Sequence, residues 1–170
     1  MEATTAKAVT SLVQELALVG VRVELPNNQP IVLLKEVEGD RYLPIWIGAV
    51  EATAIAFAQQ GIEPARPMTH DLLKDALEAV GAQLTSVRIT ELRDGIFYAL
   101  LLFASGVEVS ARPSDAIALA VRAEVPIYAA EPVLEEAGIV VEEEEQEEEV
   151  ERFREFLDTI TPEDFQTGSQ

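Results

Sequence analysis

Short turns between apolar runs constrain the fold of this chain more than any other feature. Residues 18–25 and 30–37 are rich in β-forming side chains, and only PNNQ separates them. Only EGD separates the second run from residues 41–48. Strands joined by so few residues must pair antiparallel, because a parallel connection needs a dozen residues or more. A second group repeats the pattern with the separators RDG and ASG, and its predicted strands are 85–92, 95–103 and 107–111.

Helical patterns lie between and after the two strand groups. The predicted helices are 49–60, 70–81, 115–124 and 132–138, with a short strand at 125–130. The order βββ-αα-βββ-α-β-α predicts an α+β domain, with helices packed against a mixed, mainly antiparallel sheet. The first helix is apolar nearly all round, so we expect it to be buried. Thr69 and Ser114 are the predicted N-caps of the second and third helices.

The charge is uneven along the 170 residues, whose net charge is -19. Residues 1–140 hold ten basic and nineteen acidic residues, a balance of -9, and residues 141–170 hold two and twelve, a balance of -10. We therefore expect four parts: an N-terminal extension (1–17), a compact domain (18–140), an acidic linker (141–150), and a short amphipathic helix with a C-terminal tail (151–170). An acidic domain repels polyphosphate unless a basic patch or a metal intervenes.

The absence of certain segments indicates a location. The chain has no cysteine, no apolar run of the length that a membrane span needs, and no clear signal-peptide cleavage site. We therefore expect a cytoplasmic protein without a membrane partner. A protein partner is predicted for the acidic C-terminal tail, because FREFLDTI after a charged spacer is typical of a docking segment.

Two predicted helix starts, ARPSDAIALA and RPMTHDLLKD, share an arginine, a proline, a hydroxyl and an aspartate. The free N–H groups of a helix start bind anions, and a neighbouring arginine strengthens that binding. Asp115 suits the opposite use, as a metal ligand or a general base. The structural alternative is that Ser114 caps the helix, that Asp115 complements the helix dipole, and that Arg112 pairs with Asp115 or another carboxylate.

Three further groups invite a functional or a structural interpretation. His70, the only histidine, suits a general base or a metal ligand, and the alternative is an exposed residue beside a dipole-favoured Asp71. Glu51 lies in a helix predicted to be buried, so it should pair with an arginine or a metal unless it is an exposed first-turn residue. Tyr42 and Trp46 are able to stack on bases, but strand alternation favours core packing.

Four blocks in this order resemble the bifunctional nuclease domain family. The blocks are YLPIWIGAVEATAIA (42–56), RPMTHDLL (66–73), LRDGIFYALL (92–101) and ARPSDAIALAVRAEVPIY (111–128). The resemblance covers about residues 18–140 and implies an α+β homodimer with a groove in each subunit, DNase and RNase activity, and a divalent metal. The family-motif positions are Glu51, Arg66, Thr69, His70, Asp71, Asp94, Arg112, Ser114 and Asp115. The residue before ARPSD is often an aspartate in this family and is Ser110 here.

The resemblance implies a metal-dependent nuclease that hydrolyses phosphodiester bonds in DNA and RNA. In this hypothesis Arg66 and Arg112 hold phosphate with Thr69 and Ser114, and His70 activates or positions water. Asp71, Asp115 and Glu51 bind Mg²⁺ or Mn²⁺ and complete the catalytic set. One alternative is a dimeric binding or regulatory module without catalysis, and another is a protein that binds a small phosphorylated ligand. Carboxylates converging on a metal would favour the enzyme, and carboxylates held in arginine pairs would favour the module.

Overall fold

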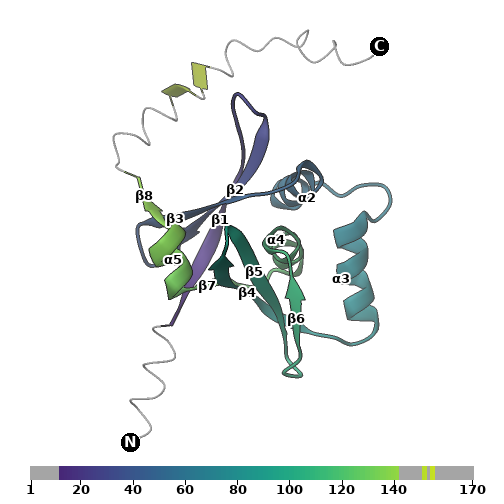
Figure 1. Ribbon diagram of the computed structural model, residues 1–170. Coiled ribbons are helices and arrows are strands. Elements are labelled where there is room, and N and C mark those ends of the chain that lie inside the picture. Colours follow the sequence, from purple (N-terminus) through teal and green to yellow (C-terminus); the bar gives the residue numbers. More distant parts are fainter. Residues whose placement is uncertain (1–11, 142–150, 153, 156–170) are drawn as a thin grey trace, which may run out of the picture. The chain divides into compact units, whose positions relative to one another are not determined.

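The computed structural model of the protein describes residues 12–141, 151, 152, 154 and 155. The chain divides into two compact units, residues 1–139 and residues 140–170, and the first unit contains the site residues (Figure 1). Most of the predicted N-terminal extension, the acidic linker from residue 142 onward and most of the predicted amphipathic helix lie outside the described residues.

The described residues form an α+β structure with one large sheet. The strands are β1 (Val13–Glu24), β2 (Gln29–Glu36), β3 (Arg41–Trp46), β4 (Leu84–Arg93), β5 (Ile96–Phe103), β6 (Glu108–Ala111), β7 (Ile127–Ala130) and β8 (Ile139–Val140). The helices are α2 (Ala49–Gln59), α3 (Thr69–Ala79), α4 (Pro113–Ala123) and α5 (Glu131–Ala137). This order confirms the predicted fold class, with β8 added at the end. The longest of these helices has 11 residues, too few to cross a membrane.

The sheet is mixed and mainly antiparallel, as predicted. Its strand order is β6-β5-β4-β7-β1-β2-β3-β8. The pairs that join β1 to β2 and β7, β2 to β3, β4 to β5 and β5 to β6 are antiparallel, whereas β4 and β7 run parallel. The parallel pair follows from the crossover through α4, which returns the chain to the middle of the sheet.

The turn between β4 and β5 shows how local sequence fixes the register. Asp94 and Gly95 have φ values of 52° and 76°. Two successive positive φ values are typical of the tight hairpin turns that match strand twist, and Asp-Gly is a preferred pair for them. The predicted RDG hairpin is therefore confirmed, and Arg93 pairs with Ile96 across it.

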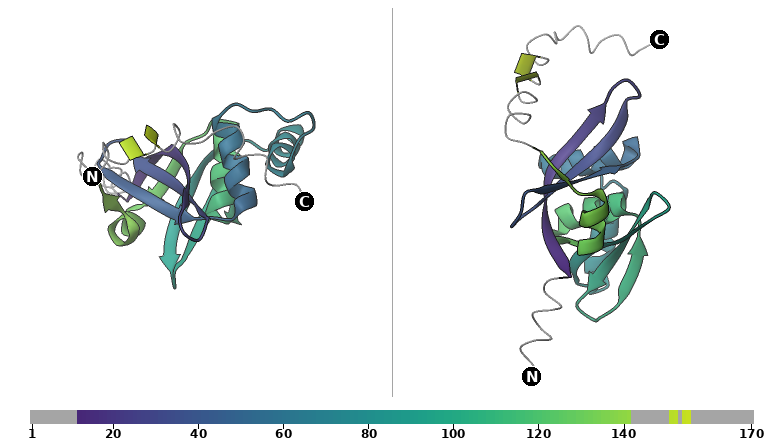
Figure 2. Two further views of the ribbon diagram at one scale, coloured as in Figure 1. Left: turned by 90° about the horizontal axis from the view of Figure 1, so that it is seen from above. Right: turned by 60° about the vertical axis from the view of Figure 1, so that its left-hand side comes forward.

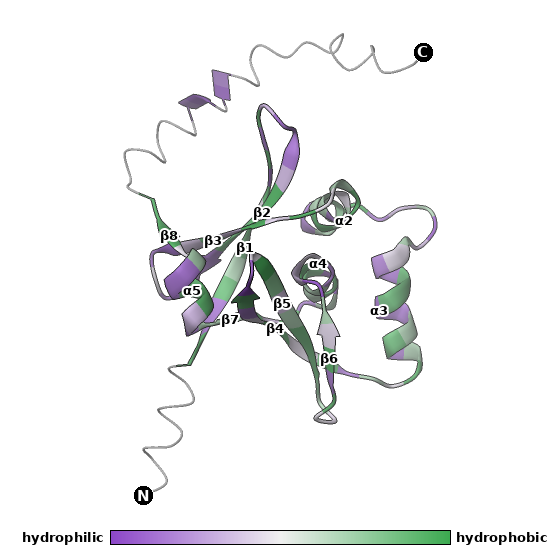
Figure 3. Ribbon diagram, in the orientation of Figure 1, coloured by the Kyte–Doolittle hydropathy of each residue, from purple (hydrophilic) through white to green (hydrophobic). Residues whose placement is uncertain are grey.

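One face of the sheet, which we call the inward face, carries the core. Its strand residues form a single buried cluster with residues of α2, α4 and α5, and Figure 2 shows α2 and α4 lying together on one side of the strands. The central members of the cluster are Val32, Leu34, Leu43, Val87, Ile89, Ile117, Leu119, Ala129 and Leu134. Figure 3 shows the apolar colour of β5. Burial of these side chains supplies the main driving force for folding.

Helix α4 is the centre of the fold and sets the position of the site. Residues Pro113 to Ala120 are buried except Asp115, and Figure 1 shows α4 nearly end-on between α2 and α3. The uninterrupted run AIALA explains this burial, since small and branched apolar side chains face the sheet and the flanking helices together. Arg112, directly before the helix, is exposed, and Asp115 in its first turn is half-buried.

Several local predictions were wrong. Met68 and Arg112 are the N-caps of α3 and α4, so the predicted caps Thr69 and Ser114 already lie inside their helices. In α4 the helix begins one residue before Ser114, because Pro113 occupies the first helical position. Strand β1 begins at Val13 because its first four residues pair with β7. Helix α2 is buried on one side only, and Val50 is 74% exposed.

Trp46 was also placed wrongly by strand alternation. It lies at the end of β3, pairs with Ile31 and is 53% exposed. Alternation identifies two faces of a strand but does not say which face is covered. The helices pack against the face of β3 that carries Leu43 and Ile45. The opposite face, which carries Trp46, therefore lies outside the core.

Candidate functional site

The starts of α2, α3 and α4 meet through their first-turn side chains. Glu51 is the third residue of α2, His70 the second of α3, and Asp115 the third of α4. Arg112, the N-cap of α4, lies among them. We call these four side chains the helix-start cluster. It unites residues that are up to 64 positions apart, because α4 packs between the other two helices.

Arg112 joins two carboxylates. Its Nε donates to Asp115 Oδ2 at 2.8 Å and its Nη2 donates to Glu51 Oε1 at 2.8 Å. The Arg112 side chain is nevertheless 66% exposed, and its Nη1 has no partner among the described residues. The predicted pairing of Arg112 with Asp115, and of Glu51 with an arginine, is confirmed. The arginine thus presents one free edge to solvent.

His70 and Asp115 form the second link of the cluster. His70 Nε2 lies 2.9 Å from Asp115 Oδ1, and the His70 residue is only 8% exposed. A carboxylate at one ring nitrogen fixes the tautomer and leaves the other nitrogen, Nδ1, as the free basic atom. The predicted alternative of an exposed His70 is wrong, since the ring is buried beside α4.

The surroundings favour the ionised forms of the cluster. Burial raises the pKa of Asp115, but hydrogen bonds from Arg112 and His70 outweigh it and the net pKa is lowered. A hydrogen bond from its own backbone N–H, with the Arg112 bond, lowers the pKa of Glu51. The bonds to Asp115 and Glu51 in turn raise the pKa of Arg112. All three groups are therefore charged at neutral pH.

Asp71 does not join the cluster. Arg122 Nε donates to Asp71 Oδ1 at 2.7 Å, and this bond lowers the pKa of Asp71. Asp71 also accepts a 3.0 Å hydrogen bond from the backbone N–H of Met68, which satisfies a free donor at the start of α3. Its neighbour His70 reaches toward Asp115 instead, in line with the different directions of successive helical residues.

The other predicted site residues lie around or outside the cluster. Arg66 and Thr69 are exposed before and at the start of α3, and Arg66 has no hydrogen bond or ion pair among the described residues. Ser114 is buried, at 7% exposure. Asp94 lies in the β4–β5 turn, where its positive φ serves the hairpin. Ser110 pairs with Leu100 inside β6, two residues before Arg112.

The predicted metal ligands do not fit a divalent cation as they lie. The guanidinium of Arg112 stands between Glu51 and Asp115, and Asp71 faces Arg122. No group of three or more His, Cys, Asp or Glu side chains in the described part of the chain is arranged to hold a metal ion. A divalent ion would have to displace an arginine that already neutralises both carboxylates. The Mg²⁺ or Mn²⁺ cofactor stays a prediction.

Sequence reasoning missed two contributors to the site region. The carboxylate of Glu51 folds back over Gly48, the N-cap of α2, so closely that a Cβ there would collide with it. Arg122 is 8% exposed and also donates to the carbonyls of Ala118 and Ala54, which ties α4 to α2. A glycine directly before a helix was a signal for the first, whereas a basic residue in a last helical turn was too common to indicate the second.

A second ionic group lies elsewhere on the inward face. Arg41 donates in a bidentate manner to Glu36, at 2.7 and 3.0 Å, and also to Glu131, at 2.8 and 3.1 Å. Glu36 is 7% exposed. Bidentate arginine–carboxylate pairs are strong and directional. This group joins β2, β3 and α5 and contains none of the predicted site residues.

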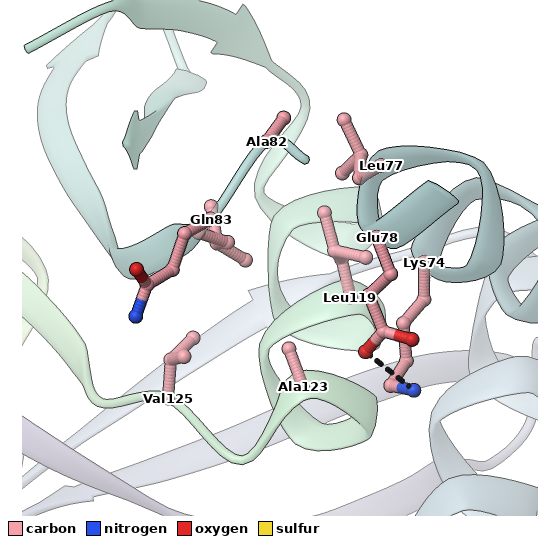
Figure 4. Close-up of a pocket in the computed structure, with 9 residues that line it drawn as sticks. Lys74, Leu77, Glu78, Ala82, Gln83, Leu119, Ala123 and Val125 are labelled. Carbon is pink, nitrogen blue, oxygen red and sulfur yellow. Dashed lines mark ion pairs between the residues drawn. The ribbon is translucent and has the colours of Figure 1, made fainter. Parts of the chain in front are cut away.

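A small cavity of about 250 Å³ lies between α3, α4 and the start of β4. Figure 4 shows Leu77, Leu119 and Val125 in its wall and the ion pair between Lys74 and Glu78 beside it. None of the predicted site residues lines it. The cavity therefore does not add to the helix-start cluster.

Comparison with known proteins links the fold to a family. The family model of the bifunctional nuclease domain matches residues 32–142. An uncharacterized protein of Mycobacterium tuberculosis is 54% identical over 160 residues, which cover 89% of this chain and 98% of the relative. Bifunctional nuclease 2 of Arabidopsis thaliana is 34% identical over 112 residues, 61% of this chain and 34% of the plant protein. Bifunctional nuclease 1 of Oryza sativa subsp. indica is 31% identical over 59% of this chain and 32% of its own length.

Proposed function

Because the chain belongs to the bifunctional nuclease domain family, we propose that it binds a phosphodiester group of nucleic acid at the helix-start cluster and hydrolyses that bond. The contact that carries the proposal is the 2.9 Å pair of His70 Nε2 and Asp115 Oδ1. It lies beside an arginine whose free edge faces solvent. A histidine oriented by a carboxylate is the usual arrangement of a general base.

Each residue of the cluster has a distinct role in this proposal. Arg112 contacts a phosphate oxygen through Nη1 and stabilises the charge that develops there. Asp115 holds the ring, so that Nδ1 of His70 takes the proton of the attacking water. Glu51 is a positioning residue that acts through Arg112. Arg66, exposed on the loop before α3, adds a second positive charge, since the cluster alone has two carboxylates for one arginine.

A second function is favoured by a separate observation. Glu51, Asp71 and Asp115 all lie in arginine pairs, which is the arrangement expected of a binding or regulatory module without catalysis. Such a module would use Arg112 and Arg66 to bind phosphate and would release the nucleic acid intact. The homodimer, the small phosphorylated ligand, the cytoplasmic location and the protein partner of the C-terminal tail stay predictions.

Cleavage and binding measured on the same oligonucleotides separate the two functions. Purified full-length protein is mixed with labelled single-stranded DNA and RNA, in EDTA and in Mg²⁺ or Mn²⁺, and products are resolved on gels. His70→Gln and Asp115→Asn should abolish cleavage while fluorescence anisotropy still detects binding. Asp75→Asn, an exposed change on the same helix as His70, is the matched control and should cleave normally.

The outcomes of this experiment differ clearly. Binding without cleavage under every condition would favour the module. Cleavage that survives in folded His70→Gln and Asp115→Asn variants would exclude the cluster as the active site. Neither binding nor cleavage by the wild type would reject a nucleic-acid substrate. Cleavage that requires Mg²⁺ or Mn²⁺ would show that the cation displaces Arg112 or binds elsewhere.

A further inference from the structure

Trp46 is the only exposed aromatic residue in the described part of the chain, with an exposed fraction of 53%. The rings of Tyr42 and Tyr98 are already engaged, because Lys35 and Arg93 lie 5.6 and 4.7 Å from their centroids. No hydrogen bond or ring contact engages the indole of Trp46 among the described residues. Tryptophan joins a large apolar ring to a polar N–H, which makes it a common residue of binding surfaces.

The neighbouring strand supports the indole from below. Ile31 pairs in register with Trp46, so both side chains lie on the outward face of the sheet, opposite the inward face. Ile31 is only 6% exposed, although it belongs to no part of the core cluster. It must therefore be covered by side chains of the outward face, and its cross-strand neighbour Trp46 is placed to cover it. One side of the indole then rests on the sheet while the other faces solvent.

The position of Trp46 links it to the helix-start cluster. Gly48, the N-cap of α2, comes two residues after Trp46 and three before Glu51. Two extended residues and one helical turn keep the Cα atoms of Trp46 and Glu51 within about 12 Å of each other. Glu51 Oε1 in turn accepts the 2.8 Å hydrogen bond from Arg112 Nη2. A nucleotide spans a comparable distance between its phosphate and the far edge of its base.

We propose that Trp46 stacks on an unpaired base of single-stranded nucleic acid whose phosphate is held by Arg112. This inference rests on the proposed function of the helix-start cluster and names its substrate class. Every base has a π-face, so stacking on an aromatic ring tolerates any sequence but requires a base that is free to stack. In a duplex the bases stack on one another and present only their edges in the grooves. The indole therefore selects single strands. Val50, 74% exposed beside Glu51, adds apolar surface next to it.

Stacking also answers the difficulty posed by charge. Residues 1–140 have a balance of -9, which disfavours a long run of phosphate contacts. A stacked base contributes affinity that does not depend on net charge, so Arg112 and Arg66 need to hold only one or two phosphates. Each phosphate neutralised on a single strand contributes about -0.7 to the slope of log affinity against log salt concentration. We therefore expect a slope of about -1.4 or one less steep.

The intrinsic fluorescence of Trp46 tests the inference directly, because it is the only tryptophan of the chain. A short phosphorothioate-linked oligothymidylate, which resists hydrolysis, should quench this fluorescence in the full-length protein, and the same strand annealed to its complement should not. In fluorescence anisotropy, Trp46→Ala should weaken single-strand binding by about fivefold to 100-fold, the range of one lost base stack. Trp46→Phe should keep most of the affinity, since a phenyl ring also stacks. Val107→Ala, an apolar residue 55% exposed before β6, is the matched control and should bind normally.

Arg112→Gln in the same assay separates this inference from the proposed function. Single-strand affinity that is unchanged in folded Trp46→Ala but lost in Arg112→Gln would overturn the role of Trp46 and leave the cluster as the phosphate site. Affinity that is lost in Trp46→Ala but unchanged in Arg112→Gln would keep the stacked base and reject the cluster as its phosphate site. Equal affinity for duplex and single strand would overturn the selectivity. No binding of any oligonucleotide by the wild type would overturn both proposals.

Discussion

Arg122, in the last turn of α4, donates a 2.7 Å hydrogen bond to Asp71 in the first turn of α3. The two residues are 51 positions apart, and the arginine is nearly buried. The pair fixes α3 against α4 and so sets the direction from which the neighbouring His70 approaches Asp115. It therefore links the stability of the domain to the geometry of the helix-start cluster.

Asp71→Asn should destabilise the protein by about 1–3 kcal/mol, because a nearly buried guanidinium loses its charged acceptor. Urea denaturation monitored by circular dichroism measures the change in the free energy of unfolding. Asp75→Asn, an exposed carboxylate on the same helix, should change it little. An equal loss in both variants would mean that the effect is general to the acidic side of α3 and not due to Arg122.

Gly48→Ala should displace the carboxylate of Glu51 from Arg112, because the new methyl group collides with it. The expected result is a rise of the Glu51 pKa toward its ordinary value of 4.5, measured by NMR titration of the side-chain carboxyl. In a Glu51→Ala background the same glycine change should cost much less stability, since the colliding group is gone. Additive losses of stability in the double variant would refute the contact.

Arg41→Met should lower the free energy of unfolding at pH 7 by about 3–5 kcal/mol, since Glu36 is then left buried and charged without a partner. The Arg41 bonds lower the pKa values of Glu36 and Glu131 below the ordinary 4.5. A depressed folded-state pKa gives stability that is present above the unfolded value and lost as pH falls through the folded one. The gap between wild type and variant should therefore shrink below about pH 4.5.

A gap that stays constant down to pH 3 would contradict this assignment. Glu38→Gln serves as the control, because Glu38 is an exposed carboxylate in the turn between β2 and β3. Its difference from the wild type should be small at every pH. Urea denaturation at half-unit steps of pH provides both curves.

Gly95→Val should destabilise the protein by about 1–2 kcal/mol, since a β-branched residue disfavours the φ of 76° in the β4–β5 turn. Asp94→Asn should cost little, because asparagine accepts the positive φ equally well. If Asp94 serves only the turn, Asp94→Asn should also leave any nucleic-acid cleavage unchanged. A loss of cleavage in a fully stable Asp94→Asn variant would give this residue a role in the site.

The sequence was sufficient for the strand groups, the hairpins and the order of elements, because short turns and apolar periodicity are local signals. It was also sufficient to expect that Arg112 meets Asp115, three residues away on one helix. It did not separate the neighbours His70 and Asp71, whose partners lie on opposite ends of α4. That difference depends on how α3 crosses α4, which no local pattern encodes.

Local sequence patterns also could not predict which face of the sheet the helices cover. Trp46 and Ile45 alternate along β3, and both are good core residues. Only the placement of α2, α4 and α5 decides that Ile45 is buried and Trp46 is not. The prediction also began the first strand too late, at residue 18. Residues 13–16 belong to β1 because they pair with β7, which lies more than a hundred residues later in the chain.

The ion pair between Glu51 and Arg112 has a consequence for the synthesis of the protein. Glu51 follows β3 and Arg112 follows β6, which stand far apart in the strand order. A growing chain that has not yet released Arg112 and Asp115 from the ribosome holds Glu51 and His70 without their partners. The cluster therefore forms only after the central helix α4 has been made, and any activity that depends on it cannot begin before that point of synthesis.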